Sequence, residues 1–218
     1  MKNHKIITGF VILLSCIYSC KEQSNQHAQK ATLIDSLITS DSIETLKAYY
    51  EKAHGTGDTL KFKQLFFASF PNNFNSFNSL YGYNDEKEMP LYSYYYNHIN
   101  FFCKLVSEQA DAEGYKKLIR LGVGGHWDAD AVNLLQDCIE HYVNENPSLA
   151  LSQLKKFNDK EIKSIWKFFY DGPHPSDTQI EKRYSDLYEK IKVLDLIMAD
   201  IMKNEYERLV KESEMHGQ

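Results

Sequence analysis

Residues 124–141, GGHWDADAVNLLQDCIEH, bring together two histidines, a cysteine, three aspartates and a glutamate. These side chains are the ones that bind zinc or transfer protons in enzymes. On a helix, Asp137 and His141 would face the same side, because residues four positions apart are neighbours on the helix surface. His174, in the polar turn DGPHPSD, is a possible third ligand. One hypothesis is therefore a metal site formed by Asp137, His141 and His174.

Helix geometry favours a different interpretation of this segment. Gly124 and Gly125 end the preceding helix, Asp128 occupies the capping position of the next one and Asp130 lies in its first turn, where acidic groups stabilise the free amides. A rise of 1.5 Å per residue would separate Asp130 from His141 by about 16 Å. Zinc holds its ligands within about 2.3 Å, so these two residues cannot share one ion. We therefore predict an ordinary helix without a metal, a cofactor or a catalytic residue.

Aromatic residues are concentrated in residues 62–102, which contain 14 of the 29 aromatic side chains. A helix is predicted from Leu91 to about Gln109, with one apolar stripe formed by Leu91, Tyr95, Ile99, Phe102 and Val106. Tyr94, Tyr96 and Phe101 lie about 100° or more from the centre of that stripe. Either this helix is covered on several sides, or its far side meets a partner. The candidate partner-binding residues are Tyr92, Tyr94, Tyr96, Phe101 and Trp127, because aromatic side chains are enriched at interfaces.

Apolar residues recur at a helical period along almost the whole chain, and no alternating run indicates a strand longer than four residues. We expect an all-α fold, either an irregular multi-helix bundle or a short stack of helix pairs with a long C-terminal helix. The predicted helices span residues 41–54, 59–70, 72–81, 91–109, 111–121, 128–145, 148–157, 159–170 and 178–214.

The last predicted helix is unusually long. Its apolar residues at 180, 184, 187, 191, 194, 198 and 201 fit a helix packed on the outside of a bundle or the seam of a coiled-coil dimer. Unbroken, its roughly 37 residues would measure about 55 Å. It therefore either runs along the entire domain or breaks between Asp195 and Asn204.

The N-terminal residues, MKNHKIITGFVILLSCIYSC, place Lys2 and Lys5 before an apolar run at residues 6–14. This is the layout of a secretory signal, and the run is too short to cross a hydrocarbon core of about 30 Å. The segment resembles the lipobox of bacterial lipoproteins, with an aliphatic residue at −3 and a small residue at −1 before a lipidated cysteine. Both LLSC, ending at Cys16, and IYSC, ending at Cys20, fit this pattern.

We expect Cys20 to be lipidated, with Cys16 as the alternative, because the chain becomes polar directly after Cys20. Residues 1–19 are then a signal peptide, 20–31 a polar tether and 32–218 one helical domain. The resemblance implies a membrane anchor of acyl chains such as palmitate, and ordinary secretion is the alternative. Lys21, rather than an aspartate, follows the cysteine, which by the same resemblance implies the outer membrane. The leaflet that the protein faces stays open.

Charge and cysteine content narrow the range of partners. The net charge of −5 becomes −7 when residues 1–19, which contain Lys2 and Lys5 and no acidic residue, are removed. Such a chain lacks the basic face that nucleic acid requires and suits a basic protein partner better. Cys103 and Cys138 are the remaining cysteines. They form either a disulfide in an oxidising compartment or two buried thiols.

Residues 70–83, FPNNFNSFNSLYGY, resemble a pattern found in small helical bacterial proteins that accompany secreted toxins as immunity proteins. This resemblance implies binding to a toxin. Together with the lipobox and the acidic charge, it leads us to expect an envelope lipoprotein that binds a protein, a basic toxin in the most concrete version, without catalysis. Two alternatives remain open. One is a glycan-binding lipoprotein that uses exposed tyrosines and Trp127, and the other is a metal-dependent envelope hydrolase.

Overall fold

A computed structural model describes residues 40–84, 87–109, 111–128 and 130–216. The predicted signal peptide, Cys16, Cys20 and the tether lie outside the described residues, as does the expected start of the domain at residue 32. The residues from Ser42 to Gln218 form one compact unit.

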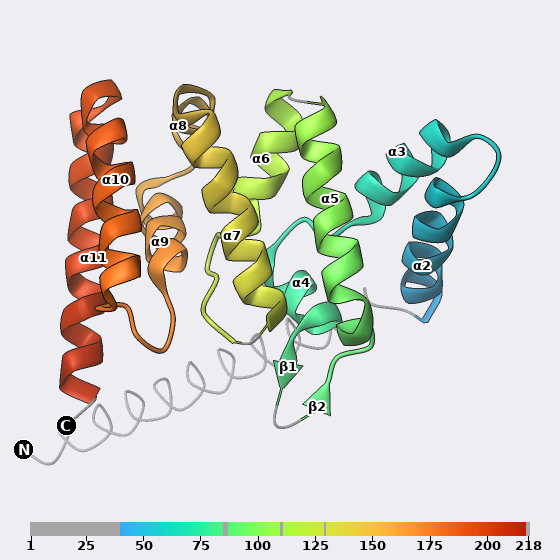
Figure 1. Ribbon diagram of the computed structural model, residues 1–218, viewed down its shortest axis with the longest axis horizontal. Coiled ribbons are helices and arrows are strands. Elements are labelled where there is room, and N and C mark those ends of the chain that lie inside the picture. The colour runs from blue at the N-terminus through green and yellow to red at the C-terminus, as the bar shows by residue number, and fades with distance from the viewer. Residues whose placement is uncertain (1–39, 85–86, 110, 129, 217–218) are drawn as a thin grey trace, which may run out of the picture. The chain divides into compact units, whose positions relative to one another are not determined.

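The prediction of an all-α fold is confirmed (Figure 1). The helices are α2 (Ser40–His54), α3 (Thr59–Ser69), α4 (Phe74–Tyr81), η1 (Tyr92–Tyr94, a 3₁₀ turn), α5 (Tyr95–Gln109), α6 (Ala112–Arg120), α7 (Asp130–Glu145), α8 (Pro147–Leu154), α9 (Asp159–Tyr170), α10 (Thr178–Leu194) and α11 (Leu196–His216). Within the described ranges the only strands are β1 (Tyr83–Asn84) and β2 (Lys87–Glu88), an antiparallel pair with Tyr83 opposite Glu88. None of the described helices combines the length and the apolar character that a membrane span requires.

Side-chain caps start several of these helices where the sequence predicts them. Asp58 accepts a hydrogen bond from the Lys61 amide at the start of α3, and Asn158 forms a capping box with Glu161 at the start of α9. Asp128 is different. The prediction that it caps the helix after the glycines is wrong, because α7 begins at Asp130 and the Asp128 carboxylate accepts a hydrogen bond from the Tyr83 amide of β1.

Helices that follow one another in the sequence also pack against one another in space. α5 contacts α3, α6 and α7, α6 packs on α8, and α9 lies against α7 and α11. Figure 1 shows the resulting series, from α2 and α3 on one side to α10 and α11 on the other. α5 is therefore covered on several sides, which was one of the two interpretations of its aromatic far side.

The hydrophobic core is largely aromatic. Phe70 stacks on Phe102 with ring centroids 4.1 Å apart, which joins the chain after α3 to α5. Phe168 of α9 passes so close to the loop after α6 that a Cβ atom on Gly125 would lie 2.5 Å from its ring. The glycines before Trp127 thus allow the loop to pack against the core, which is a structural role.

The predicted C-terminal helix breaks at Asp195. The Asp195 backbone is extended (φ −159°, ψ 98°), and its carboxylate accepts a hydrogen bond from the Met198 amide at the start of α11. α10 and α11 then pack against each other as a helical hairpin. Buried residues of the apolar stripe, such as Leu187, Ile191 and Met198, are used for packing within the chain.

A disulfide joins Cys103 of α5 to Cys138 of α7, with the Cα atoms 6.3 Å apart. Of the two possibilities that the sequence left open, the structure has the paired cysteines. The Tyr142 hydroxyl donates a hydrogen bond to the Cys103 carbonyl beside the bridge. The two longest helices of the central region are thereby held together both covalently and by a side-chain contact.

Candidate functional site

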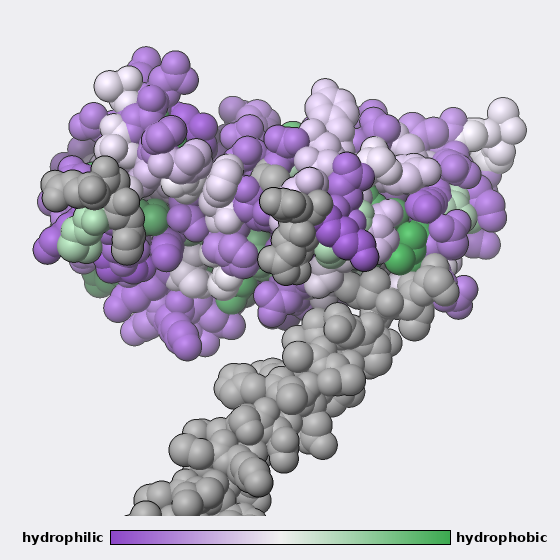
Figure 2. Space-filling view, turned by 90° about the horizontal axis from the view of Figure 1, so that it is seen from below, coloured by the Kyte–Doolittle hydropathy of each residue, from purple (hydrophilic) through white to green (hydrophobic). Residues whose placement is uncertain are grey.

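Four aromatic side chains lie along one edge of the unit, and we call them the aromatic edge: Tyr83, Tyr92, Tyr96 and Trp127. They come from β1, η1, the first turn of α5 and the α6–α7 loop. Tyr96 is 64% exposed, Trp127 is 38% exposed and Tyr83 is similarly open. These elements meet at the end of the helices from which the β-hairpin projects (Figure 1). Figure 2 looks onto the molecule from that side and shows mostly hydrophilic residues, with hydrophobic ones scattered between them.

Hydrogen bonds between distant segments hold this edge in place. The ring centroids of Tyr83 and Tyr92 are 5.6 Å apart. The Tyr83 amide donates to Asp128 Oδ2 (2.9 Å), and the Tyr92 hydroxyl donates to Asp130 Oδ2 (3.0 Å). Burial of the Tyr92 hydroxyl and this hydrogen bond raise the pKa of Tyr92 to about 12.

Trp127 is fixed by two hydrogen bonds that leave part of its ring open. Its backbone amide donates to Asp171 Oδ2 (2.9 Å), and its indole Nε1 donates to Asn133 Oδ1 (2.8 Å). Because the polar atom of the indole already has a partner, what Trp127 presents to solvent is apolar surface. The orientation of the ring therefore depends on both the α7 helix and the loop after α9.

Trp127 also lines a pocket of about 350 Å³ between α7, the end of α9 and the start of α10. Gln136, Asp137 and Arg183 contribute polar walls. Tyr170 also lines the pocket, and its hydroxyl is buried without a hydrogen-bond partner among the described residues.

The charge along the aromatic edge is negative. Asp128, Asp130 and Asp171 have no lysine or arginine partner within the described part of the chain. Arg183 is the basic residue of the neighbouring pocket, and it is paired with Glu140 and lies 3.8 Å from Asp137. Three carboxylates beside exposed aromatic rings favour a cationic partner.

Two of the predicted partner-binding residues lie away from this edge. Phe101 is only 7% exposed, because Tyr50 and His54 of α2 cover its ring at centroid distances of 5.4 and 4.5 Å. Its assignment to a partner surface is therefore wrong. Tyr94 is half-buried, with its ring 5.3 Å from that of His98 and 5.2 Å from Lys47 Nζ. A substitution at Tyr94 would disturb the core as well as the surface.

The residues of the metal hypothesis do not come together. No three His, Cys, Asp or Glu residues in the described ranges are placed to hold a metal ion. Asp137 faces Arg183, the His141 ring lies 5.5 Å from that of Tyr142, and His174 is an exposed residue of the α9–α10 loop. Cys138 is in the disulfide and offers no thiolate.

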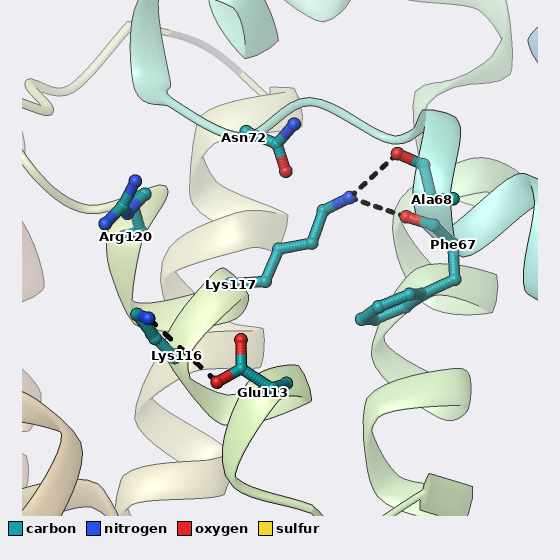
Figure 3. Close-up of a pocket in the computed structure, with 7 residues that line it drawn as sticks. All are labelled: Phe67, Ala68, Asn72, Glu113, Lys116, Lys117 and Arg120. Atoms are coloured by element: carbon teal, nitrogen blue, oxygen red, sulfur yellow. Dashed lines mark hydrogen bonds and ion pairs between the residues drawn. The ribbon is translucent and has the colours of Figure 1, made fainter.

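A second pocket, of about 340 Å³, lies between α3 and α6 (Figure 3). Lys117 Nζ donates to the carbonyls of Phe67 and Ala68, which belong to the last turn of α3 and have no partner within that helix. Burial lowers the pKa of Lys117 to about 8. Lys116 points away from these carbonyls and lies 3.9 Å from Glu113. Lys117 therefore satisfies free carbonyls at the end of α3, and Lys116 pairs with Glu113. Both lysines of this pocket thus have structural roles.

Sequence reasoning missed several residues of the site, namely Tyr83, Asn133, Gln136, Asp171 and Arg183. Asp171 directly follows the predicted end of the helix at residues 159–170. This position after a helix was the one local feature that could have indicated a role for it. Tyr83 follows a helix-ending glycine but gives no sign of its contact with Asp128, 45 residues later.

No family model, no curated protein and no solved structure was found to match this chain.

Proposed function

We propose that the protein is a lipid-anchored envelope protein that binds a basic protein partner through the aromatic edge and catalyses no reaction. Its most concrete form is an immunity protein that neutralises a secreted toxin. The observation that carries the proposal is that exposed aromatic side chains share one edge with three carboxylates that have no basic partner among the described residues. These carboxylates accept hydrogen bonds from the Tyr83 amide, the Tyr92 hydroxyl and the Trp127 amide.

The two kinds of side chain act at different distances. Carboxylates attract a basic partner over several ångströms and speed its capture, an effect that salt weakens. Buried tyrosine and tryptophan side chains usually supply most of the energy once the surfaces touch. The net charge, −5 for the full sequence and −7 without residues 1–19, adds to the attraction across the whole molecule.

The cysteines support the proposed compartment. Disulfides persist in oxidising compartments such as the bacterial periplasm and are rare in the cytosol. The Cys103–Cys138 bridge therefore agrees with export, which the N-terminal resemblance to lipoproteins also implies. An immunity protein needs to meet its toxin where the toxin acts, and an envelope anchor suits a toxin that attacks the wall or the membrane.

The test combines Trp127→Ala with Tyr96→Ala. Cells without the gene should die in contact with toxin-producing neighbours, and the wild-type protein should restore survival while the double variant should not. Affinity for the toxin should fall by about 2 kcal/mol or more, roughly thirtyfold in Kd, because two aromatic contacts are truncated. The measurements are survival in mixed culture and binding calorimetry.

Leu60→Ala is the matched control, since Leu60 is 65% exposed on α3 and lies outside the aromatic edge. It should protect cells as well as the wild type does. Tyr96→Ala and Leu60→Ala should melt close to the parent, because these side chains are 64% and 65% exposed. Trp127→Ala should melt slightly earlier, because it loses the hydrogen bond to Asn133 Oδ1, and the melting curves show whether each variant is folded. Immunity is wrong if cells that lack the gene survive as well as the parent does.

A glycan is the second candidate ligand, and the pocket beside Trp127 favours it. Sugar sites commonly combine an aromatic face with amide, carboxylate and guanidinium groups, and Gln136, Asp137 and Arg183 supply these here. Tyr96 is not among the residues that line this pocket. A glycan should therefore lose affinity with Trp127→Ala alone and be indifferent to Tyr96→Ala, whereas a protein partner across the edge should respond to both.

A further inference from the structure

Four aliphatic side chains are exposed together at the turn between α10 and α11, and we call them the apolar tip: Val193, Leu194, Leu196 and Ile197. Their exposed fractions are 85%, 48%, 56% and 75%. Single exposed aliphatic residues are common, but a run of this kind marks an interaction surface. The turn lies at the end of the helices opposite the β-hairpin (Figure 1), so it is separate from the aromatic edge.

The structure holds the apolar tip in a defined conformation. Asp195, the polar residue in the middle of the run, is turned inward, where its carboxylate binds Lys155 Nζ (2.7 Å) and the Met198 amide (3.0 Å). Ile191 and Met198 on either side are buried. The turn therefore keeps its charged group away from solvent and presents aliphatic side chains outward.

We propose that the apolar tip inserts into the lipid interface of the membrane that carries the anchor. The inference rests on the anchoring part of the proposed function. An acyl anchor already holds the chain at the surface, so a second, shallow apolar contact need only fix the orientation of the protein.

The size of the tip argues against a second copy of the chain as its occupant. Four aliphatic side chains can bury on the order of 400 Å² at most, so two copies in contact through their tips would bury roughly 800 Å² together. A stable interface between two proteins buries roughly 1,200–2,000 Å². A membrane imposes no such minimum on a protein that is already anchored, because each inserted side chain adds to the existing attachment.

The charges around the tip suit anionic headgroups. Two acidic residues near the tip are neutralised, Asp195 by Lys155 (2.7 Å) and Glu189 by Lys192 (3.4 Å). Lys190 donates to the amide oxygen of Asn144 and Lys156 to that of Gln153, and neither is paired with an acid among the described residues, so their positive charges are not neutralised there. Asp200, one turn further along α11, adds one negative charge. An acidic chain thus has a slightly basic rim at this turn, and lysines near a bilayer surface are attracted to anionic lipids.

The length of the chain between Cys20 and Ser40 permits this contact. About 20 residues can span up to roughly 70 Å when extended. α11, with 21 residues, is about 32 Å long, so the anchor does not restrict which end of the helices reaches the bilayer. With the tip in the membrane, the aromatic edge would point into the compartment, where a partner arrives.

The test places a tryptophan in the tip of the full, lipidated chain. Ile197→Trp protein is inserted into vesicles of phosphatidylethanolamine and phosphatidylglycerol. Its tryptophan fluorescence is compared between lipids with and without bromine on the acyl chains, after subtraction of the fluorescence of the parent protein. Bromine quenches only tryptophans that reach the acyl region, so the added tryptophan should lose most of its emission. Glu88→Trp, on the exposed strand β2 at the opposite end, is the control and should keep its emission.

Equal emission of Ile197→Trp in both kinds of vesicle would overturn the proposal, and so would equal quenching of Glu88→Trp. Sedimentation of the unlipidated Cys20→Ser protein provides a second measurement. It should be monomeric, and a dimer that dissociates on Ile197→Asp would assign the tip to a second copy instead. The binding of a partner by Trp127 and Tyr96 is measured separately, so a failure here leaves the proposed function standing.

Discussion

His98 is a fully buried polar side chain at the first turns of α5. Its Nδ1 lies 3.0 Å from the Tyr81 hydroxyl, and the rings of Tyr50 and Phe66 pack around it at 4.8 and 5.4 Å. The other ring nitrogen, Nε2, has no hydrogen-bond partner within the described ranges. Burial, together with the charge of Lys47, lowers the pKa of His98 to about 4. The imidazole is thus neutral in the folded protein at physiological pH.

This depressed pKa predicts a loss of stability in mild acid. Between pH 6.5 and about 4 the unfolded chain binds a proton at His98 that the folded protein does not bind. The free energy of unfolding should therefore fall as the pH falls through this window, by about 3 kcal/mol in total from this residue. Urea unfolding of the wild type and of His98→Phe between pH 7 and pH 4 measures this fall in the free energy of unfolding.

The variant should show a flatter pH dependence, even though it leaves the Tyr81 hydroxyl without a partner and is less stable at pH 7. His141→Gln, at an exposed position of α7, is the control and should follow the wild type. If the free energies of unfolding of the wild type and His98→Phe changed in parallel with pH, the lowered pKa of His98 would be contradicted.

At the scale of elements, α5 and α7 are the central pair. α5 packs against α3, α6 and α7, and α7 also contacts α8 and α9. The disulfide joins this pair across a sequence separation of 35 residues. Closing a loop of this length in the unfolded chain removes much of its freedom, so the bridge should stabilise the fold substantially.

Removal of the bridge should lower the free energy of unfolding by about 3 to 4 kcal/mol, from the loop-closure entropy of a loop of this length. The comparison is between the wild type and the Cys103→Ser/Cys138→Ser variant in urea unfolding, each with and without a reductant. The reductant should destabilise the wild type and leave the double variant unchanged. A wild type that is insensitive to the reductant would mean that the two thiols are free.

At the scale of the whole molecule, the two proposed contact surfaces lie at opposite ends of the helices. The aromatic edge is acidic and aromatic, and the apolar tip is aliphatic with a slightly basic rim. A protein with both would be held by its lipid, oriented by its tip and left open to a partner on the far end. This arrangement depends on the anchor, which can be tested by itself.

Metabolic labelling with an acyl precursor should mark the mature protein, and Cys20→Ser should abolish the label. The reason is that lipidation occurs on the cysteine of the lipobox, and Cys20 directly precedes the polar segment. Gel analysis of labelled cells detects the acyl label on the protein. Cys16→Ser serves as the comparison: if it loses the label while Cys20→Ser keeps it, Cys16 is the lipidated residue, and an unlabelled wild type rules out the lipoprotein assignment.

Local signals in the sequence determined the helices and most of their ends. Asp58, Asn158 and Glu161 each satisfy amides within one turn of their own position, so a window of a few residues holds the information. The apolar stripe of α5 and the helical period of the remaining segments are likewise local. The same reasoning placed Tyr92, Tyr96 and Trp127 among the candidates, because composition indicates which side chains suit an interface.

The tertiary structure decided everything that depends on two distant segments meeting. Phe101 is buried because α2 packs over it, and Asp128 binds Tyr83 instead of capping its own helix. The cysteines pair because α5 and α7 bring their Cα atoms to 6.3 Å. Val193 and Ile197 are exposed because the chain reverses at Asp195, whose partner Lys155 lies in another part of the sequence. Such contacts are set by the packing of whole helices, which no window of neighbouring residues contains.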